Sequence, residues 1–168
     1  MKRIAVTGAI GSGKSFVCRE IEALGVPVFN CDDEARRLMA EDGTLRERVT
    51  ALVGSDEKSA LRAFVARGGE NVEKLNALVH PCVRKSWEDF CAAHATEKVV
   101  VKECALLFES RMETLVDKTV CVVAPEDTRI RRVMQRDGVD EKYVRDIMKL
   151  QMTQEEKMNR ADIVFKNF

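Results

Sequence analysis

The sequence has no long hydrophobic run and no excess of charge of either sign. No apolar stretch approaches the roughly 20 residues that a membrane-spanning helix needs. The N-terminal stretch MKRIAVTG passes directly into glycine and polar residues, without the apolar run of a secretory signal. Lysine plus arginine and aspartate plus glutamate both number 28, so no general attraction to nucleic acid or to an anionic membrane is expected. We therefore expect a cytoplasmic protein without a membrane or nucleic-acid partner, and the sequence indicates no obligate protein partner.

Paired cysteines are also missing. None of the six cysteines forms a CxxC pair, which excludes a plainly encoded zinc site or dithiol redox motif. We expect them to be small buried side chains in a reducing compartment. They are Cys18, Cys31, Cys82, Cys91, Cys104 and Cys121.

Short apolar runs alternate with helical patterns along most of the chain. Alternation of this kind predicts an α/β fold with a doubly wound parallel sheet in a single domain. The expected strands are residues 3–7, 26–30, 98–108, 118–125 and 161–168. The expected helices outside the middle of the chain are residues 15–25, 32–43, 126–138 and 140–152, and Thr153 with Glu156 forms a capping box for one more. Residues 44–95 are helical throughout, with polar breaks, and predict a helical insertion.

The stretch GAIGSGKS, residues 8–15, matches the phosphate-binding pattern GxxxxGK[ST] in full. It follows a predicted strand and precedes a predicted helix, which is the context that the motif requires. Glycines let the backbone N–H groups wrap phosphate oxygens, and the helix N-terminus favours an anion. Lys14 is expected at the β and γ phosphates and Ser15 at a Mg²⁺ ion. The predicted nucleotide-binding residues are Gly8, Gly11, Ser12, Gly13, Lys14, Ser15 and Phe16.

Acidic residues follow two of the other predicted strands. Glu103 ends an apolar strand, where it is expected either near the metal or in a structural contact with backbone or Lys102. Asp32 and Asp33 come at the carboxyl end of the second strand, the edge at which open α/β sheets bind ligands. One of them could act as a general base, or both could simply be the first-turn acids that helices favour.

Three arginines recur at helical spacing late in the chain. Arg129, Arg132 and Arg136 share one face of the predicted helix 126–138. Such a face is either solvated, or it belongs to a lid that brings guanidinium groups to a transferring phosphoryl group, with a hinge at Gly138.

His80 directly precedes Pro81, whose ring biases the backbone of His80 toward extended geometry. A lone histidine is more often structural than functional. From the residues alone, its role stays open.

Seven stretches, taken in order from end to end, resemble the dephospho-CoA kinase family. They are TGAIGSGKS, NCDDEARRL, LNALVHP, LLFE, RRVMQRD, the glutamine of LQM, and ADIVFKN. The resemblance implies a three-layer P-loop NTPase fold with a helical CoA-binding insertion at about 33–95 and a helical lid at about 126–152. It also implies ATP-dependent phosphorylation of the ribose 3′-hydroxyl of dephospho-CoA, the last step of coenzyme A synthesis, with Mg²⁺.

The resemblance assigns roles residue by residue. Asp32 matches the family's candidate base for the ribose hydroxyl, whereas Asn30 stands where the family has a first aspartate. Arg132 and Arg136 match lid arginines that contact phosphate. The remaining implied contacts are His80 and Glu109 for the acceptor, and Ser15 and Glu103 for Mg²⁺.

Two other functions remain open at this point. One is another nucleoside or nucleotide kinase of the P-loop group, because the loop and lid are shared among these enzymes. The other is a nucleotide-dependent switch that holds ATP without transferring phosphate. No Asn-Lys-x-Asp string follows a later strand, which disfavours a signalling GTPase.

Overall fold

The computed structural model describes all 168 residues and divides them into two compact units. One unit comprises residues 1–30 and 94–168, and it contains every strand. The other comprises residues 31–93 and is helical, close to the insertion predicted at about 33–95.

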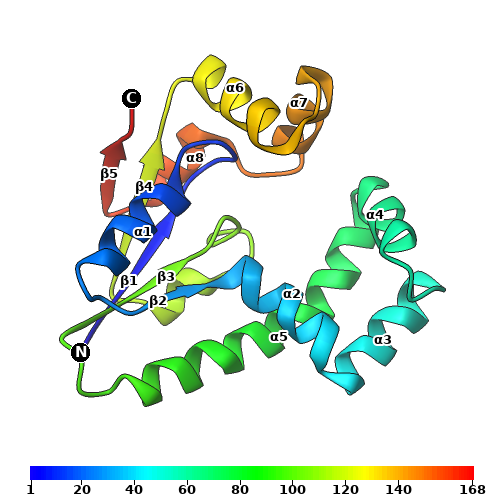
Figure 1. Cartoon of the computed structure of the whole chain (residues 1–168), viewed down its shortest axis with the longest axis horizontal. Helices are drawn as coiled ribbons and strands as arrows, with labels where there is room; N and C mark the ends of the chain where they lie inside the picture. The colour runs from blue at the N-terminus through cyan, green and yellow to red at the C-terminus, as the bar shows by residue number, and fades with distance from the viewer. The chain divides into compact units, whose positions relative to one another are not determined.

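The first unit is built on a five-stranded parallel sheet with the strand order β2-β3-β1-β4-β5 (Figure 1). The α/β fold class with a parallel sheet is therefore confirmed. Four of the strands are shorter than the apolar runs that predict them, β3 most of all, because the run 98–108 leaves the sheet after Glu103. Strand β1 begins one residue earlier than predicted. Their bounds are β1 Lys2–Thr7, β2 Val28–Asn30, β3 Val99–Glu103, β4 Lys118–Val123 and β5 Ile163–Lys166.

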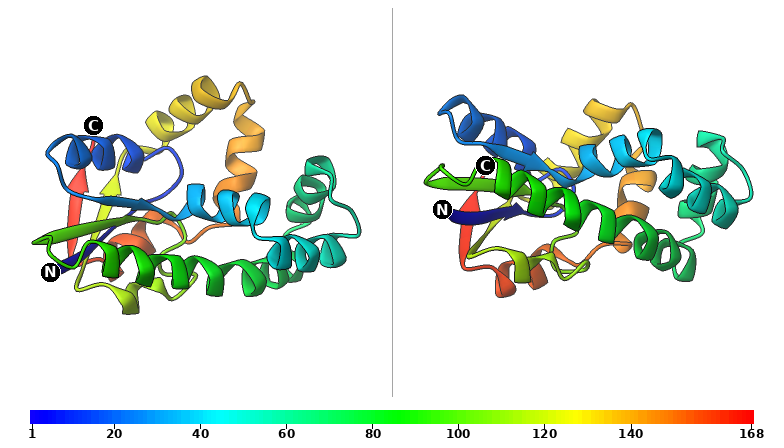
Figure 2. Two further views of the ribbon diagram at one scale, coloured as in Figure 1. Left: turned by 60° about the horizontal axis from the view of Figure 1, so that its bottom comes forward. Right: turned by 90° about the horizontal axis from the view of Figure 1, so that it is seen from below.

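Helices cover the two faces of this sheet. Helix α1 lies on one face, and α8 lies with the short 3₁₀ helix η1 on the other (Figure 2). Both faces of the central strands are therefore shielded, which explains their nearly continuous apolar sequences. The helices of this unit are α1 Lys14–Ala23, η1 Met112–Leu115, α6 Glu126–Asp137, α7 Glu141–Lys149 and α8 Gln154–Arg160.

The core on the α1 face joins the helix to three strands. Cys18 of α1 packs with Val6, Val101 and Val122, which come from β1, β3 and β4. Burying apolar side chains of this size contributes about 1.5–3 kcal/mol each. This cluster holds the start of α1, and therefore the phosphate-binding motif, against the middle of the sheet.

Helices α6 and α7 share a smaller apolar cluster of their own. Ile130 and Val133 of α6 pack with Val144 of α7, and Ile10 of the phosphate-binding motif lies against the same cluster. Gly138 ends α6 in the left-handed conformation that favours glycine, and Asp140 begins α7 by accepting a hydrogen bond from the Tyr143 backbone N–H.

The capping box predicted at Thr153 and Glu156 is confirmed. The Thr153 hydroxyl accepts from the Glu156 N–H, and the Glu156 carboxylate accepts from the Thr153 N–H. This reciprocal pair starts α8 directly after the segment that returns from α7.

The second unit consists of four helices. Asp42 begins α3 by accepting from the Leu45 N–H, and Gly54 ends it in the left-handed conformation. The longest helix buries Leu75, Val79, Val83 and Trp87 along one stripe at helical spacing. The bounds are α2 Cys31–Glu41, α3 Gly43–Val53, α4 Lys58–Ala66 and α5 Glu70–Ala93.

Extended geometry at His80 was a wrong prediction. Both His80 and Pro81 lie inside α5, which continues without interruption through the proline. A proline inside a helix removes one backbone hydrogen bond and crowds the preceding turn, at a cost of about 3 kcal/mol. Packing of the buried stripe on both sides of Pro81 offsets this local preference.

Most of the cysteines are buried, as the sequence predicts. Five of the six thiols are buried and Cys82 is partly so, and none forms a disulfide. Burial, with a smaller contribution from Glu103, raises the pKa of Cys18 to about 12, and burial also raises the pKa of Cys121. These thiols are therefore protonated and weakly nucleophilic at neutral pH. None of the helices combines the length and the apolar character that crossing a membrane requires.

Asp162 connects the end of α8 to the sheet, and its hydrogen bonds should stabilise the fold at neutral pH but not at strongly acidic pH. Its carboxylate accepts from the Lys118 ammonium and from the Thr119 N–H and hydroxyl, and these bonds lower its pKa to about 2. The stabilisation is complete above the ordinary pKa near 3.8 and is lost as the pH falls toward 2. We expect Asp162→Asn to lower the melting temperature at pH 7. The difference in melting temperature between the variant and wild type should become smaller between pH 5 and pH 2.

Thermal unfolding monitored by circular dichroism across this pH range measures the effect. Asp89→Asn is the control, because Asp89 pairs with Lys85 on the exposed surface of a single helix, where such pairs contribute little. A gap for Asp162→Asn that stayed constant with pH would contradict the prediction.

Candidate active site

The phosphate-binding motif forms a tight turn between β1 and α1. The Ser12 N–H donates to the Ala9 carbonyl at 3.1 Å, and Gly13 caps α1 with φ of +94°. A side chain at Gly11 would overlap the backbone of Arg129, so only glycine fits there. The turn presents the N-terminus of a ten-residue helix, which is a ready site for a phosphate group.

Three side chains meet at the carboxyl ends of the strands beside this turn. The Ser15 hydroxyl donates to Glu103 Oε1 at 2.6 Å, and the Asn30 amide donates to Glu103 Oε2 at 2.9 Å. The strand register explains the meeting, because Glu103 lies opposite Val6 on one side and Asn30 on the other. Glu103 is buried, with 6% of its surface exposed, and both of its oxygens are hydrogen-bonded.

The chemistry of this trio fits Mg²⁺. Mg²⁺ prefers oxygen ligands and is usually held by one or two protein groups together with substrate phosphates and water. A hydroxyl and a carboxylate at the N-terminus of α1 supply such a donor set. No cluster of three or more histidine, cysteine, aspartate or glutamate residues in this structure suits a metal ion.

The other residues of the motif are arranged around the turn. Lys14 Nζ lies 3.5 Å from the Ala9 carbonyl, which folds the lysine side chain back over the loop. The Ser12 hydroxyl is buried without a hydrogen-bond partner. Phe16 exposes 53% of its surface on the first turn of α1.

The three arginines of α6 lie in three different environments. Arg129 is buried, with Nε donating to the Ala124 carbonyl, and burial lowers the pKa of its guanidinium. Arg132 Nη1 donates to the carbonyls of Gly11 at 3.5 Å and Ser12 at 3.4 Å. Arg136 is exposed and paired with Asp137 at 2.7 Å. Arginines expected to share one helix face therefore do not share one environment.

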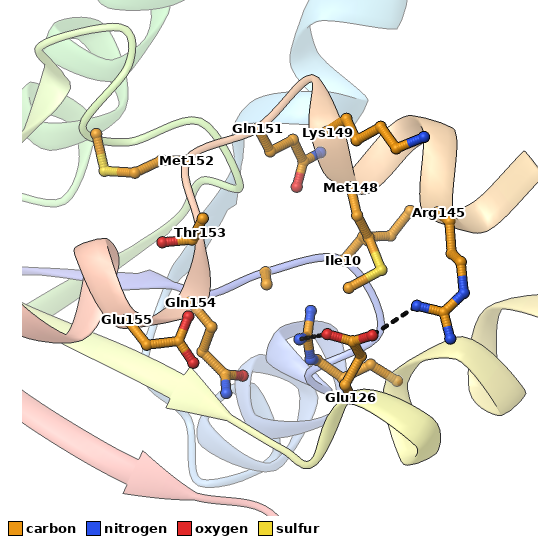
Figure 3. A pocket seen from close by; sticks show the side chains of 12 residues that line it. Ile10, Glu126, Arg145, Met148, Lys149, Gln151, Met152, Thr153, Gln154 and Glu155 are labelled. Carbon is orange, nitrogen blue, oxygen red and sulfur yellow. Dashed lines mark hydrogen bonds and ion pairs between the residues drawn. The ribbon is translucent and has the colours of Figure 1, made fainter.

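A cavity of about 300 Å³ opens between the turn and the helices that follow β4 (Figure 3). Ile10 and Met148 line it from one side, where both pack against the apolar cluster of α6 and α7, and the ion pair between Glu126 and Arg145 lies at its edge. Gln151 also lines the cavity, and its side-chain oxygen is buried without a hydrogen-bond partner. The cavity adjoins the loop and has polar capacity left for a ligand.

Asp32 and His80 belong to the helical unit. Asp32 is in the first turn of α2, next to Asp33, which pairs with Arg36 at 3.0 Å. His80 lines a shallow groove on α5, where burial and the neighbouring Arg84 lower the pKa of its imidazole. The neutral imidazole is therefore favoured at physiological pH.

Glu109 takes part in a contact that the sequence reading missed. Its Oε1 accepts from the fully buried Lys157 ammonium at 2.8 Å and from the Met152 N–H at 2.9 Å. The same ammonium donates to the Ala105 carbonyl at 2.6 Å. A lysine inside the polar helix α8 carries no sequence signal of burial, so only the structure reveals this pair.

The family model described as dephospho-CoA kinase matches residues 2–168. The chain belongs to the dephospho-CoA kinase family. This membership makes it a kinase of coenzyme A synthesis and confirms the enzyme class implied by the ordered motifs.

Similar sequences and solved structures agree with this assignment. A dephospho-CoA kinase from Salinibacter ruber is 41% identical over 177 residues, covering 99% of this chain and 89% of the relative. A crystal structure of a Thermus thermophilus protein has a TM-score of 0.87 at 34% identity, covering 99% of this chain and 88% of that one. A dephospho-CoA kinase from Campylobacter jejuni has a TM-score of 0.69 at 26% identity, covering 99% and 89%. The P-loop kinase fold is thereby confirmed.

In this dephospho-CoA kinase family member, removing Glu109 should act on stability. Glu109→Gln leaves the fully buried Lys157 ammonium without a charged partner. Because the Glu109 carboxylate is itself partly exposed, we expect a loss of about 2–4 kcal/mol of unfolding free energy, somewhat below the roughly 3–5 kcal/mol of a fully buried pair. Urea unfolding measures the loss. Glu113→Gln is the matched control, because Glu113 pairs with the more exposed Arg160 and should cost about 1 kcal/mol or less. Unchanged stability of Glu109→Gln would contradict a structural role for the pair with Lys157.

Proposed function

We propose that the chain binds ATP and Mg²⁺ at the phosphate loop and transfers the γ-phosphoryl group to the ribose 3′-hydroxyl of dephospho-CoA. The products are coenzyme A and ADP. The observation that most supports the donor half is the hydrogen bond between Ser15 and the buried Glu103, directly at the N-terminus of α1. The family assignment supports the choice of acceptor.

The donor phosphates would bind to backbone N–H groups at residues 11–15, with the Lys14 ammonium reaching the β and γ phosphates. Lys14 is already folded toward the loop by its contact with the Ala9 carbonyl. Mg²⁺ would be held by the Ser15 hydroxyl oxygen, which Glu103 orients by accepting the hydrogen bond from that hydroxyl. When bound, the ion neutralises negative charge that builds up on the phosphate oxygens.

Asp32 is the proposed general base. It follows Asn30 by two residues, and Asn30 already contacts Glu103. In the reaction the 3′-hydroxyl gives its proton to the Asp32 carboxylate while its oxygen forms the bond to the γ-phosphorus. The bond from that phosphorus to the bridging oxygen breaks, and ADP leaves with the electron pair.

The arginines and the acceptor contacts complete the proposal. Arg132 and Arg136 would offset the charge of the transferred phosphoryl group, which positioned guanidinium groups do well. Their present partners are backbone carbonyls for Arg132 and Asp137 for Arg136, so each would exchange these for phosphate oxygens. His80 and Glu109 are the proposed acceptor contacts, with Glu109 acting from its pair with Lys157.

We place this activity in the cytoplasm. Six cysteines without a disulfide suit a reducing compartment, and ATP is supplied there.

An acceptor panel tests the substrate. We expect ADP release in the presence of ATP and Mg²⁺ to depend on dephospho-CoA, and to stay at background with nucleosides and nucleoside monophosphates. A coupled assay of ADP formation measures this, and mass spectrometry of the product confirms that one phosphoryl group has been added. Turnover with a different acceptor alone would overturn the substrate proposal, and ATP binding without any turnover would favour a nucleotide-dependent switch.

Asp32→Asn tests the base. The variant keeps the shape of the side chain but cannot accept the proton, so kcat should fall by about 10²–10⁴-fold. The dissociation constant for ATP, measured by calorimetry, should stay within about twofold, because Asp32 is not proposed to touch the nucleotide. Asp33→Asn is the matched variant. Asp33 is mostly exposed and paired with Arg36, so kcat should change little. The reverse pattern would move the base to Asp33.

A further inference from the structure

The end of the last strand lies against the phosphate loop. The Asn167 N–H donates to the Val123 carbonyl at 2.9 Å, which continues the pairing of β4 with β5 by one residue. The Asn167 side-chain amide then donates to the Ser12 carbonyl at 3.0 Å. Residues 155 positions apart in the sequence are thereby joined at the loop.

We propose that Asn167 is a positioning residue that fixes the orientation of the peptide group between Ser12 and Gly13. In a trans peptide group the carbonyl oxygen and the amide hydrogen point in opposite directions. Holding the Ser12 carbonyl toward Asn167 therefore turns the Gly13 N–H the other way. That N–H is one of the donors expected to bind phosphate, so the inference rests on the nucleotide site proposed above.

This peptide group needs holding because glycine surrounds it. Gly11 and Gly13 lie on either side of Ser12, with φ of +76° and +94°. Glycine visits both signs of φ with similar ease, so the intervening peptide groups can turn over at little cost. The Asn167 amide also fills the space that a Cβ on Gly13 would occupy. The close approach of this amide and the lack of a side chain at Gly13 thus belong to one arrangement.

Arg132 also binds both residues of this contact. Its Nη1 donates to the same Ser12 carbonyl at 3.4 Å, and its Nη2 donates to the Asn167 carbonyl at 3.3 Å. Both bonds are longer than the one from the asparagine amide. If Arg132 turns to a phosphate oxygen during turnover, Asn167 remains as the shorter and neutral anchor of the loop.

The experiment compares nucleotide binding in Asn167→Asp and wild type, without any acceptor. The aspartate has nearly the same shape but places a carboxylate oxygen against the Ser12 carbonyl in place of the N–H donor. We expect the affinity for ATP and for ADP to fall about tenfold, the loss typical of one hydrogen bond to an ionised or strained group. The affinity for AMP, which lacks the β phosphate, should stay within about twofold. The Gly13 amide resonance in a ¹⁵N-correlation spectrum of the free variant should broaden or shift.

A control and a second variant separate positioning from general damage. Lys166→Ala changes an exposed neighbour on the same strand and should leave both affinities and the Gly13 resonance unchanged. Asn167→Ala removes the donor without adding a charge and should reproduce the selective loss for ATP and ADP. Equal losses for AMP, ADP and ATP, or an altered preference between ATP and GTP, would overturn the proposal by assigning Asn167 to the base. Unchanged ATP affinity in both variants would also overturn it. Because no acceptor is present, these outcomes are independent of the dephospho-CoA assignment.

Discussion

The ends of three parallel strands fix the geometry on which the donor site depends. Residues Val6, Glu103 and Asn30 lie side by side in register, so the turn after β1 begins beside the carboxylate at the end of β3. A shift of one residue in β3 would turn Glu103 to the opposite face of the sheet, because side chains alternate along a strand. The bond from Ser15 to Glu103 is therefore a consequence of the sheet as much as of the loop.

Asn30 limits the acidic side chains of this trio to one, Glu103. An aspartate at position 30 would place a second carboxylate within hydrogen-bonding distance of Glu103, and two such groups cannot both ionise without strong repulsion. The amide instead donates to Glu103 and leaves it as the one acidic side chain in the trio. The site consequently carries one negative charge to meet Mg²⁺, and the remaining oxygen ligands would have to come from the nucleotide and water.

Much of the site could be predicted from the sequence, because its signals are local. The phosphate-loop pattern, the acid at the end of an apolar strand and the capping box of α8 are three such signals. In each of them, the residues that form the pattern are only a few positions apart. The contacts that the sequence did not reveal join distant segments: Lys157 reaches Glu109, and Asn167 reaches Ser12. Neither pair has a periodic pattern, and each depends on how the chain returns to the sheet. The prediction for His80 was wrong for a different reason. A residue before proline favours extended backbone, but packing along α5 outweighs this local preference.

The two long-range contacts both lie in the first unit, and each connects segments that are far apart in the sequence. Lys157 and Glu109 connect the loop after β3 to Met152, which follows α7, so the strand that carries Glu103 is tied to the segment returning from the arginine-bearing helices. Asn167 and Arg132 connect the end of β5 and α6 to the phosphate loop itself. In both places the donors bind backbone carbonyls or the Glu109 carboxylate. The Gly11 and Ser12 carbonyls are thus hydrogen-bonded to groups outside the loop, and holding them there turns the N–H of the same peptide groups the other way, toward the region where an anion would bind.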